Sequence, residues 1–294
     1  MKKFVFLFIA AIIIFTSIFR PSYMVMVGGD YHKSRAFPAG VRFIKRDFTA
    51  PGDIIRFLNV NGPRLAKKEV DQYLLQLIAL QQIFQKSYER QLFSDTLNPG
   101  INQYKYQDLI ALRNIKEEKI KDLVQRIYAD GFKLSISEGM VYPEIDFSEL
   151  RKKYGRYATR EVLGYLRIMA AETTRHFSED AGLMVSPDGL GGRIAAIEVF
   201  CKEFPGFVRL TEITKLHKMY LSAYLIGMNN TPAFSYTTNR LDDRFFKSYG
   251  NSMRLYKGTE FARLTGEYLK LLERNNYQKT QVVLDFVVEV VEGK

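Results

Sequence analysis

Hydrophobic residues along most of this chain recur at the spacing of an α-helix. Apolar positions at i, i+3, i+4 and i+7 lie on one face of a helix. Segments with this spacing alternate with short stretches rich in Gly, Pro and Asn. The helices predicted in this way cover residues 67–93, 103–129, 146–155, 159–177, 186–204, 211–227, 239–249 and 259–274. The predicted fold class is therefore mostly α, and the uneven distances between the helix starts argue against a strict repeat array.

The last periodic segment, residues 282–291, fits two patterns. Asp285, Glu289 and Glu292 form a polar stripe at helical spacing, whereas the apolar residues between them also alternate as in a strand. We predict a helix because the segments before it are helical.

A short β element is expected before the first long helix. Residues 41–48 and 54–60 are rich in β-branched and aromatic side chains and predict either a hairpin or two separate short strands. The helices predicted at 67–93 and 103–129 follow, and we expect them to form an αα-hairpin. Residues 131–145 are expected to form a connector.

The N-terminus predicts a membrane segment. Lys2 and Lys3 precede an apolar run of 16 residues, 4–19, which is typical of a secretory signal or a signal-anchor. As a helix with about 1.5 Å of rise per residue, the run is slightly short for a hydrocarbon core of about 30 Å. No clear small-residue processing site follows it. We therefore favour a retained anchor, with cleavage within residues 1–29 as the alternative.

The net charge of +11 is concentrated near this segment. Residues 1–68 hold 12 Lys and Arg against 3 Asp and Glu, whereas residues 69–294 hold 31 against 29. The nearly neutral body argues against a nucleic-acid-binding domain. The basic stem suits contact with anionic lipid or wall polymers, and a solvated linker is the equal alternative. Long domains usually translocate despite such charges, so we expect the body on the extracytoplasmic face.

These patterns predict four segments: a signal-anchor or signal peptide at 1–22, a basic linker at 23–50, and helical domains at 51–140 and 141–294. Cys201 is the only cysteine, so no intrachain disulfide can form, and no cysteine marks a lipoprotein signal.

Candidate chemistry is sparse. Glu172, His176 and Asp180 would share one face of a helix at i, i+4 and i+8, and such a stripe can bind a metal. The neighbouring charges favour a solvated face with ion pairs instead. His32 and His217 have no visible partners, and an ordinary linker or surface position is expected for them.

The run Gly189-Leu190-Gly191-Gly192-Arg193 weakly resembles a phosphate-binding loop at a helix start. No βαβ alternation surrounds it, so we expect a flexible helix entry. Cys201 is in register with the apolar residues of the same segment and is expected to be a buried core thiol. The sequence therefore predicts no catalytic, cofactor-binding or metal-binding residues and no cofactor.

One segment, residues 54–138, resembles a known family. Val60-Asn61-Gly62 ends its predicted strand, and Gly131-Phe132-Lys133-Leu134-Ser135 follows its last helix. This order of features resembles the N-terminal domain of the SurA and PrsA group of exported chaperones. The resemblance implies a helical domain that holds extended polypeptide. The parvulin domain that often follows is not visible in residues 140–294, so no isomerase activity is expected.

The leading hypothesis is a membrane-anchored, extracytoplasmic polypeptide-binding protein that acts like a chaperone or an assembly factor. A structural protein of the cell envelope, docking a partner through residues 142–294, is the first alternative. The second is an envelope hydrolase that uses Glu138, Glu144 or Asp146.

Overall fold

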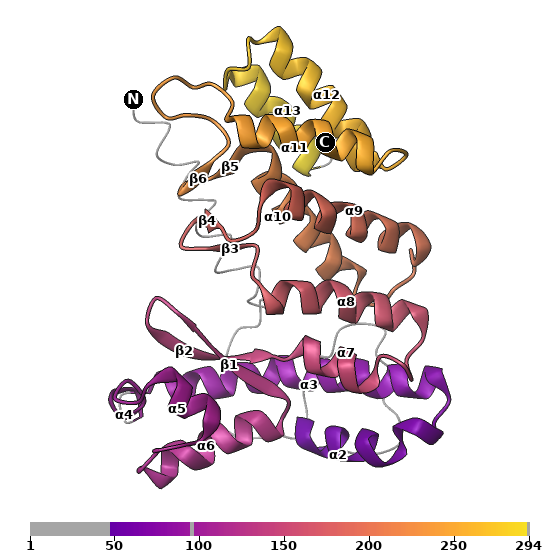
Figure 1. Ribbon diagram of the computed structural model, residues 1–294. Coiled ribbons are helices and arrows are strands. Elements are labelled where there is room, and N and C mark those ends of the chain that lie inside the picture. The colour runs from indigo at the N-terminus through magenta and orange to yellow at the C-terminus, as the bar shows by residue number, and fades with distance from the viewer. Residues whose placement is uncertain (1–47, 95–96, 293–294) are drawn as a thin grey trace, which may run out of the picture. The chain divides into compact units, whose positions relative to one another are not determined.

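The computed structural model describes residues 48–94 and 97–292. These residues form helices and three two-stranded antiparallel hairpins, so the predicted mostly-α class is confirmed (Figure 1). The predicted anchor at residues 1–22 and the linker up to residue 47 lie outside the described residues. Among the helices of 48–94 and 97–292, none combines the length and apolar character required to cross a membrane.

The chain begins with helices and continues into the first hairpin. The elements are α2 (Pro51–Asn61), a 3₁₀ turn (Gly62–Arg64), α3 (Lys67–Leu92), α4 (Asn98–Ile101), α5 (Tyr106–Ala111), α6 (Glu118–Ala129), β1 (Phe132–Ser137) and β2 (Met140–Ile145). Helix α3 confirms the prediction for residues 67–93.

The second part alternates pairs of helices with short hairpins. The elements are α7 (Phe147–Tyr154), α8 (Arg160–Thr174), β3 (Ser178–Glu179), β4 (Gly182–Leu183), α9 (Pro187–Glu203), α10 (Leu210–Ile226), β5 (Gly227–Met228), β6 (Thr231–Pro232), α11 (Asp243–Leu255), α12 (Glu260–Arg274) and α13 (Gln281–Glu292). The helices predicted from residue 146 onward are confirmed, including the ambiguous last segment.

The strand predicted at residues 54–60 is wrong, because this segment lies within α2. The carboxylate of Asp53 accepts a hydrogen bond from the backbone N–H of Ala50 at 3.1 Å and caps the helix start. Ile54 and Leu58, one helical turn apart, are both buried. Burial of this face against α3 outweighs the β preference of the Ile and Val residues. The strand that the family resemblance implies is therefore replaced by a helix.

The long helix predicted at residues 103–129 is also wrong, because it is broken into α5 and α6. Leu112 and Asn114 have φ angles of 52° and 58°, which a continuing helix does not allow. The Asn114 side chain donates to the Asp108 carboxylate at 3.0 Å and holds the break. The expected hairpin of two long helices is therefore not formed.

The predicted connector at residues 131–145 is a β-hairpin. Strands β1 and β2 pair from Phe132 opposite Ile145 to Ser137 opposite Met140. Glu138 and Gly139, at φ 50° and 77°, form the left-handed two-residue turn that suits the twist of a hairpin. The pairing crosses residue 140, which the sequence suggested as a domain boundary.

The order hairpin, helix, helix occurs three times from β1 to α12 (Figure 1). The second helices of these units begin at Arg160, Leu210 and Glu260, which are 50 residues apart. The first helices have 8, 17 and 13 residues, and this variation gives the uneven starts seen in the sequence. The array is therefore regular in the order of its elements but not in their lengths.

Adjacent hairpins are joined by hydrogen bonds. Asn230 donates its backbone N–H to the carbonyl of Ala181 at 2.9 Å, and Leu183 donates to the Thr231 hydroxyl at 3.0 Å. The Ser137 hydroxyl donates to Glu179 at 3.3 Å. The three hairpins consequently follow one another along the helical units.

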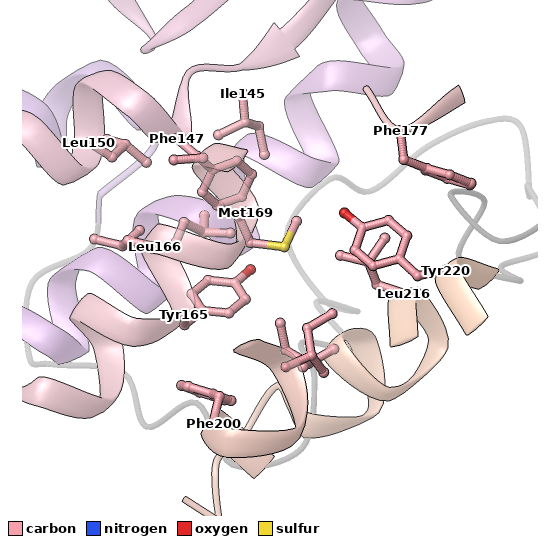
Figure 2. Close-up of a cluster of buried hydrophobic side chains, with 14 of the residues drawn as sticks. Ile145, Phe147, Leu150, Tyr165, Leu166, Met169, Phe177, Phe200, Leu216 and Tyr220 are labelled. Atoms are coloured by element: carbon pink, nitrogen blue, oxygen red, sulfur yellow. The ribbon is translucent and has the colours of Figure 1, made fainter. Parts of the chain in front are cut away.

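Aromatic and aliphatic side chains fill the space between the helices. Figure 2 shows part of this core, in which β2 and α7 contribute Ile145 and Phe147, α8 contributes Tyr165, and α9 and α10 contribute Phe200 and Tyr220. The same core therefore joins the first hairpin to the later helices.

An ion cluster at the end of helix α8

Two residues of the predicted metal stripe meet at the end of α8. Glu172, in its last turn, is 6% exposed, and half-buried His176 follows the helix. The Nδ1 atom of His176 lies 3.6 Å from Oε1 of Glu172. Asp180 does not join them, because α8 ends at Thr174 and Asp180 lies in the turn of the β3–β4 hairpin with a φ of 44°. Glu172 and His176 are therefore close together as their spacing suggested, but His176 lies after the helix, and the expected solvated face is wrong because Glu172 is buried.

Glu144 on β2, one of the three carboxylates proposed for a hydrolase, completes this site. Its Oε1 atom lies 3.0 Å from Nε2 of His176, and the residue is 8% exposed. Glu138 lies at the far turn of the hairpin, and Asp146 caps α7 by accepting a hydrogen bond from the Glu149 N–H at 2.9 Å. The three proposed carboxylates therefore do not converge.

Each of the two carboxylates has its own cation. Lys133 on β1 lies 3.0 Å from Glu144, and Arg193 on α9 lies 2.8 Å from Glu172. We call Lys133, Glu144, Glu172, His176 and Arg193 the ion cluster. With the imidazole protonated, it combines three positive and two negative charges.

Neutral groups occupy further positions on the same carboxylates. The hydroxyl of Ser135 donates to Glu144 at 2.9 Å, and the hydroxyl of Tyr220 donates to Glu172. The backbone N–H of Phe177 also donates to Glu172, at 3.2 Å. Buried carboxylates with this many donors are well satisfied.

The electrostatics of the cluster keep His176 charged. Hydrogen bonds to Glu144 and Glu172 raise its pKa to about 10. Burial alone would raise the pKa of Glu144, but its hydrogen bonds and attraction to His176 and Lys133 outweigh burial and lower it. Burial, together with the charge of Glu172, raises the pKa of Tyr220. His176 therefore holds its proton at neutral pH, where a general base must be free to accept one.

A metal does not fit this arrangement. Among the residues described, no group of three or more His, Cys, Asp or Glu side chains has a geometry that could hold a metal ion. The carboxylates of the cluster face ammonium, guanidinium and imidazolium groups instead. The ion pairs of the cluster join β1, β2, α8 and α9.

The sequence did not predict that Lys133 pairs with Glu144 or that Arg193 pairs with Glu172. Lys133 pairs across the hairpin with Glu144, and this pairing becomes visible only when Glu138 and Gly139 are read as a turn. In the sequence, Arg193 was notable only as the last residue of the glycine-rich run. Its guanidinium also donates to the carbonyl of Arg175 at 2.7 Å.

The glycine-rich run is part of α9 and not a phosphate-binding loop. Ser186 caps the helix by accepting a hydrogen bond from the Gly189 N–H at 3.1 Å. A Cβ atom at Gly191 would lie 2.8 Å from the Ser252 hydroxyl of α11. Gly191 therefore allows α11 to approach α9 closely, and the expected flexible entry is an ordered first turn.

Cys201 and His217 occupy packing positions. Cys201 is half-buried rather than buried, and burial, followed by the charge of Glu198, raises the pKa of its thiol. Glu198 lies 3.5 Å from Nε2 of His217 and accepts a hydrogen bond from the Phe261 N–H at 3.0 Å. This group therefore joins α9, α10 and α12. His32 lies outside the described residues.

A hollow of about 410 Å³ lies where α11 ends and α12 begins, away from the ion cluster. Met253 and Ala262 supply its apolar surface, and Lys257, Glu260 and Arg263 stand around it. Arg263 is paired with both Glu260 and Glu267. The hollow therefore offers apolar contact beside charges that already have partners.

Large apolar side chains are exposed on the neighbouring helices. They are Val199 of α9, Phe246 and Leu255 of α11, and Val282 and Val288 of α13. Leu255 is 58% exposed and lies two residues from Met253.

Comparison of the chain with protein-family models, with curated proteins and with solved structures finds no match.

Proposed function

We propose that this protein binds polypeptide without catalysing a reaction, as a chaperone-like or assembly factor without isomerase activity. We further propose that residues 4–19 anchor it to a membrane with its body on the extracytoplasmic face. The observation that carries the binding proposal is the hollow at the start of α12, with its apolar surface of Met253 and Ala262.

Several properties of the hollow suit a peptide side chain. It has a volume of about 410 Å³ and is open to solvent. Met253 is 37% exposed, and methionine adapts to apolar groups of different shape. Adaptable apolar contact of this kind favours a range of sequences over one small ligand.

The exposed apolar residues of α9, α11 and α13 favour a second candidate, which is docking of one folded partner. They belong to three separate helices. Exposed apolar side chains that gather into a patch mark protein–protein contacts. The hydrolase alternative draws no support from Glu144, which is held in the ion cluster.

The binding proposal is tested with the full chain in detergent micelles. Aggregation of a reduced, unfolded client is followed by light scattering in the presence of the wild type, Met253→Lys and the matched control Met184→Lys. Met184 is similarly exposed, at 40%, but lies after the β3–β4 hairpin. We expect the wild type and the control to suppress aggregation, and Met253→Lys to lose this effect because a charge enters the apolar surface.

Absence of suppression by the wild type, together with absence of crosslinked clients in cells, would contradict the proposal. Capture of one stoichiometric folded partner would favour the docking candidate. The proposed location is tested separately by fusing to Lys294 a reporter that is active only on the extracytoplasmic side. We expect this fusion to be active.

A further inference from the structure

We propose that the ion cluster is a latch that holds the β1–β2 hairpin against the end of α8, so that breaking it increases local opening of the hairpin at that end. The hairpin contributes Lys133 and Glu144, and the later helices contribute Glu172 and Arg193. His176 joins the two pairs through its two ring nitrogens, at 3.0 Å from Glu144 and 3.6 Å from Glu172.

The composition of the cluster allows it to open without leaving a buried charge unpaired. Without the imidazolium, Glu144 retains Lys133, and Glu172 retains Arg193 and the hydroxyl of Tyr220. Removing one member of a simple buried ion pair would instead leave an uncompensated charge. Each half therefore keeps its charges paired. His176 joins the two halves, together with a hydrogen bond from the Lys133 ammonium to the carbonyl of Thr173 in α8.

The opposite face of the hairpin is held elsewhere. Phe132 packs against Tyr88 of α3 with ring centroids 5.6 Å apart, and the Gln85 side chain donates to the carbonyl of Pro143 at 3.0 Å. Loss of the His176 contacts therefore loosens the hairpin at the end of α8 while it stays on α3, and the hydrogen bond from Ser137 to Glu179 still joins it to the next hairpin.

Further polar contacts cross the same seam near the starts of helices. Asp71 of α3 accepts a hydrogen bond from the Thr159 N–H at 3.0 Å, at the start of α8. Gln82 of α3 accepts hydrogen bonds from Arg209, which precedes α10, at 3.1 and 3.2 Å. Helix α8 has 15 residues and is thus about 22 Å long. The latch and the Asp71 contact lie at its opposite ends, which places the hinge at the start of α8.

The charged groups around His176 also determine the pH range in which the latch is closed. They are Glu144 and Lys133 from the hairpin, Glu172 from α8, Arg193 from α9 and, as a hydroxyl, Tyr220 from α10. The two carboxylates keep the imidazole protonated at neutral pH. The latch is therefore closed at neutral pH and weakens as alkaline pH removes that proton.

The test is hydrogen–deuterium exchange of the full chain in detergent micelles, comparing the wild type with His176→Gln. The matched control is His217→Gln, because His217 also lies beside a carboxylate, 3.5 Å from Glu198, but away from the seam. We expect amide exchange in residues 132–145 and 173–184 to rise by about tenfold in His176→Gln, through local opening. Exchange in α3 and in α11 to α13 should stay unchanged, and the control should match the wild type.

The variant His176→Lys distinguishes the effect of the positive charge at this position from the effect of side-chain packing. A lysine returns a cation between the two carboxylates, so exchange in the hairpin should stay close to that of the wild type. The proposal is overturned if His176→Gln leaves exchange at 132–145 and 173–184 unchanged. It is equally overturned if exchange rises to the same extent in every element, because that result reports general destabilisation.

Discussion

Replacing Glu172 with glutamine tests how strongly the ion cluster stabilises the fold. The side chain keeps nearly the same shape but loses its negative charge. It then faces the Arg193 guanidinium, the protonated His176 and the Tyr220 hydroxyl without compensating them. Arg193 has only 16% of its side chain exposed, so water cannot replace the lost carboxylate freely.

The expected loss follows from this burial. Breaking a buried ion pair by removing one partner typically costs about 3–5 kcal/mol. Arg193 keeps the carbonyl of Arg175, and His176 keeps Glu144, so the lower end of the range applies. We expect the free energy of unfolding to fall by about 3 kcal/mol, which in a domain of this size lowers Tm by roughly 6–12 °C.

The assay is urea and thermal unfolding of the full chain in detergent, followed by circular dichroism. Glu179→Gln is the matched control, because this carboxylate is exposed and accepts a single hydrogen bond among the described residues, from the half-buried Ser137; its effect should stay within about 0.5 kcal/mol. Adding Arg193→Met to Glu172→Gln should cost less than the sum of the two single changes by at least about 1 kcal/mol. A loss as small as that of the control, or simple additivity with Arg193→Met, would refute the reasoning.

Three further predictions concern other features. The pKa of His176 is raised from 6.5 to about 10, so its stabilising contribution is complete below pH 6.5 and is lost as pH rises towards 10. The difference in urea unfolding between the wild type and His176→Gln should therefore shrink over this interval, and a constant difference would contradict it. Tyr249→Phe removes the hydroxyl that donates to the carbonyl of Leu225 at 2.8 Å, and should cost about 1 kcal/mol in the same assay. Gly227→Ala should cost more than about 3 kcal/mol and lower the folded yield, because Gly227 has a φ of 73° and a Cβ atom would lie 2.2 Å from the backbone nitrogen of Ala233. Near-wild-type stability of the alanine variant would show that the backbone there can rearrange.

Local signals in the sequence correctly predicted the helices that have both a capping residue and a periodic apolar face. Ser186 followed by Pro187 marked the start of α9, and Thr259 marked the start of α12. Side-chain caps and the spacing of buried residues act within one or two helical turns, so they can be read without knowing the neighbours. The mostly helical class followed from these signals.

The same signals failed where packing reverses a local preference. Residues 54–60 have the composition of a strand, but their burial against α3 makes them helical. The left-handed residues Leu112 and Asn114 break the predicted long helix. The repeated order of hairpin and two helices was hidden because the first helix of each unit has a different length.

The ion cluster shows what the sequence determined and what only the tertiary structure decided. Residues four apart in the sequence stay close together, so Glu172 in the last turn of α8 and His176 just after the helix lie 3.6 Å apart. Their other partners come from a strand 28 residues or more before Glu172 and from a helix 21 residues after it. Such contacts depend on how hairpin and helices pack, which short-range periodicity does not encode. The sequence therefore determined the charges and the closeness of Glu172 and His176, whereas the packing of the hairpin and the helices decided which ion pairs they form.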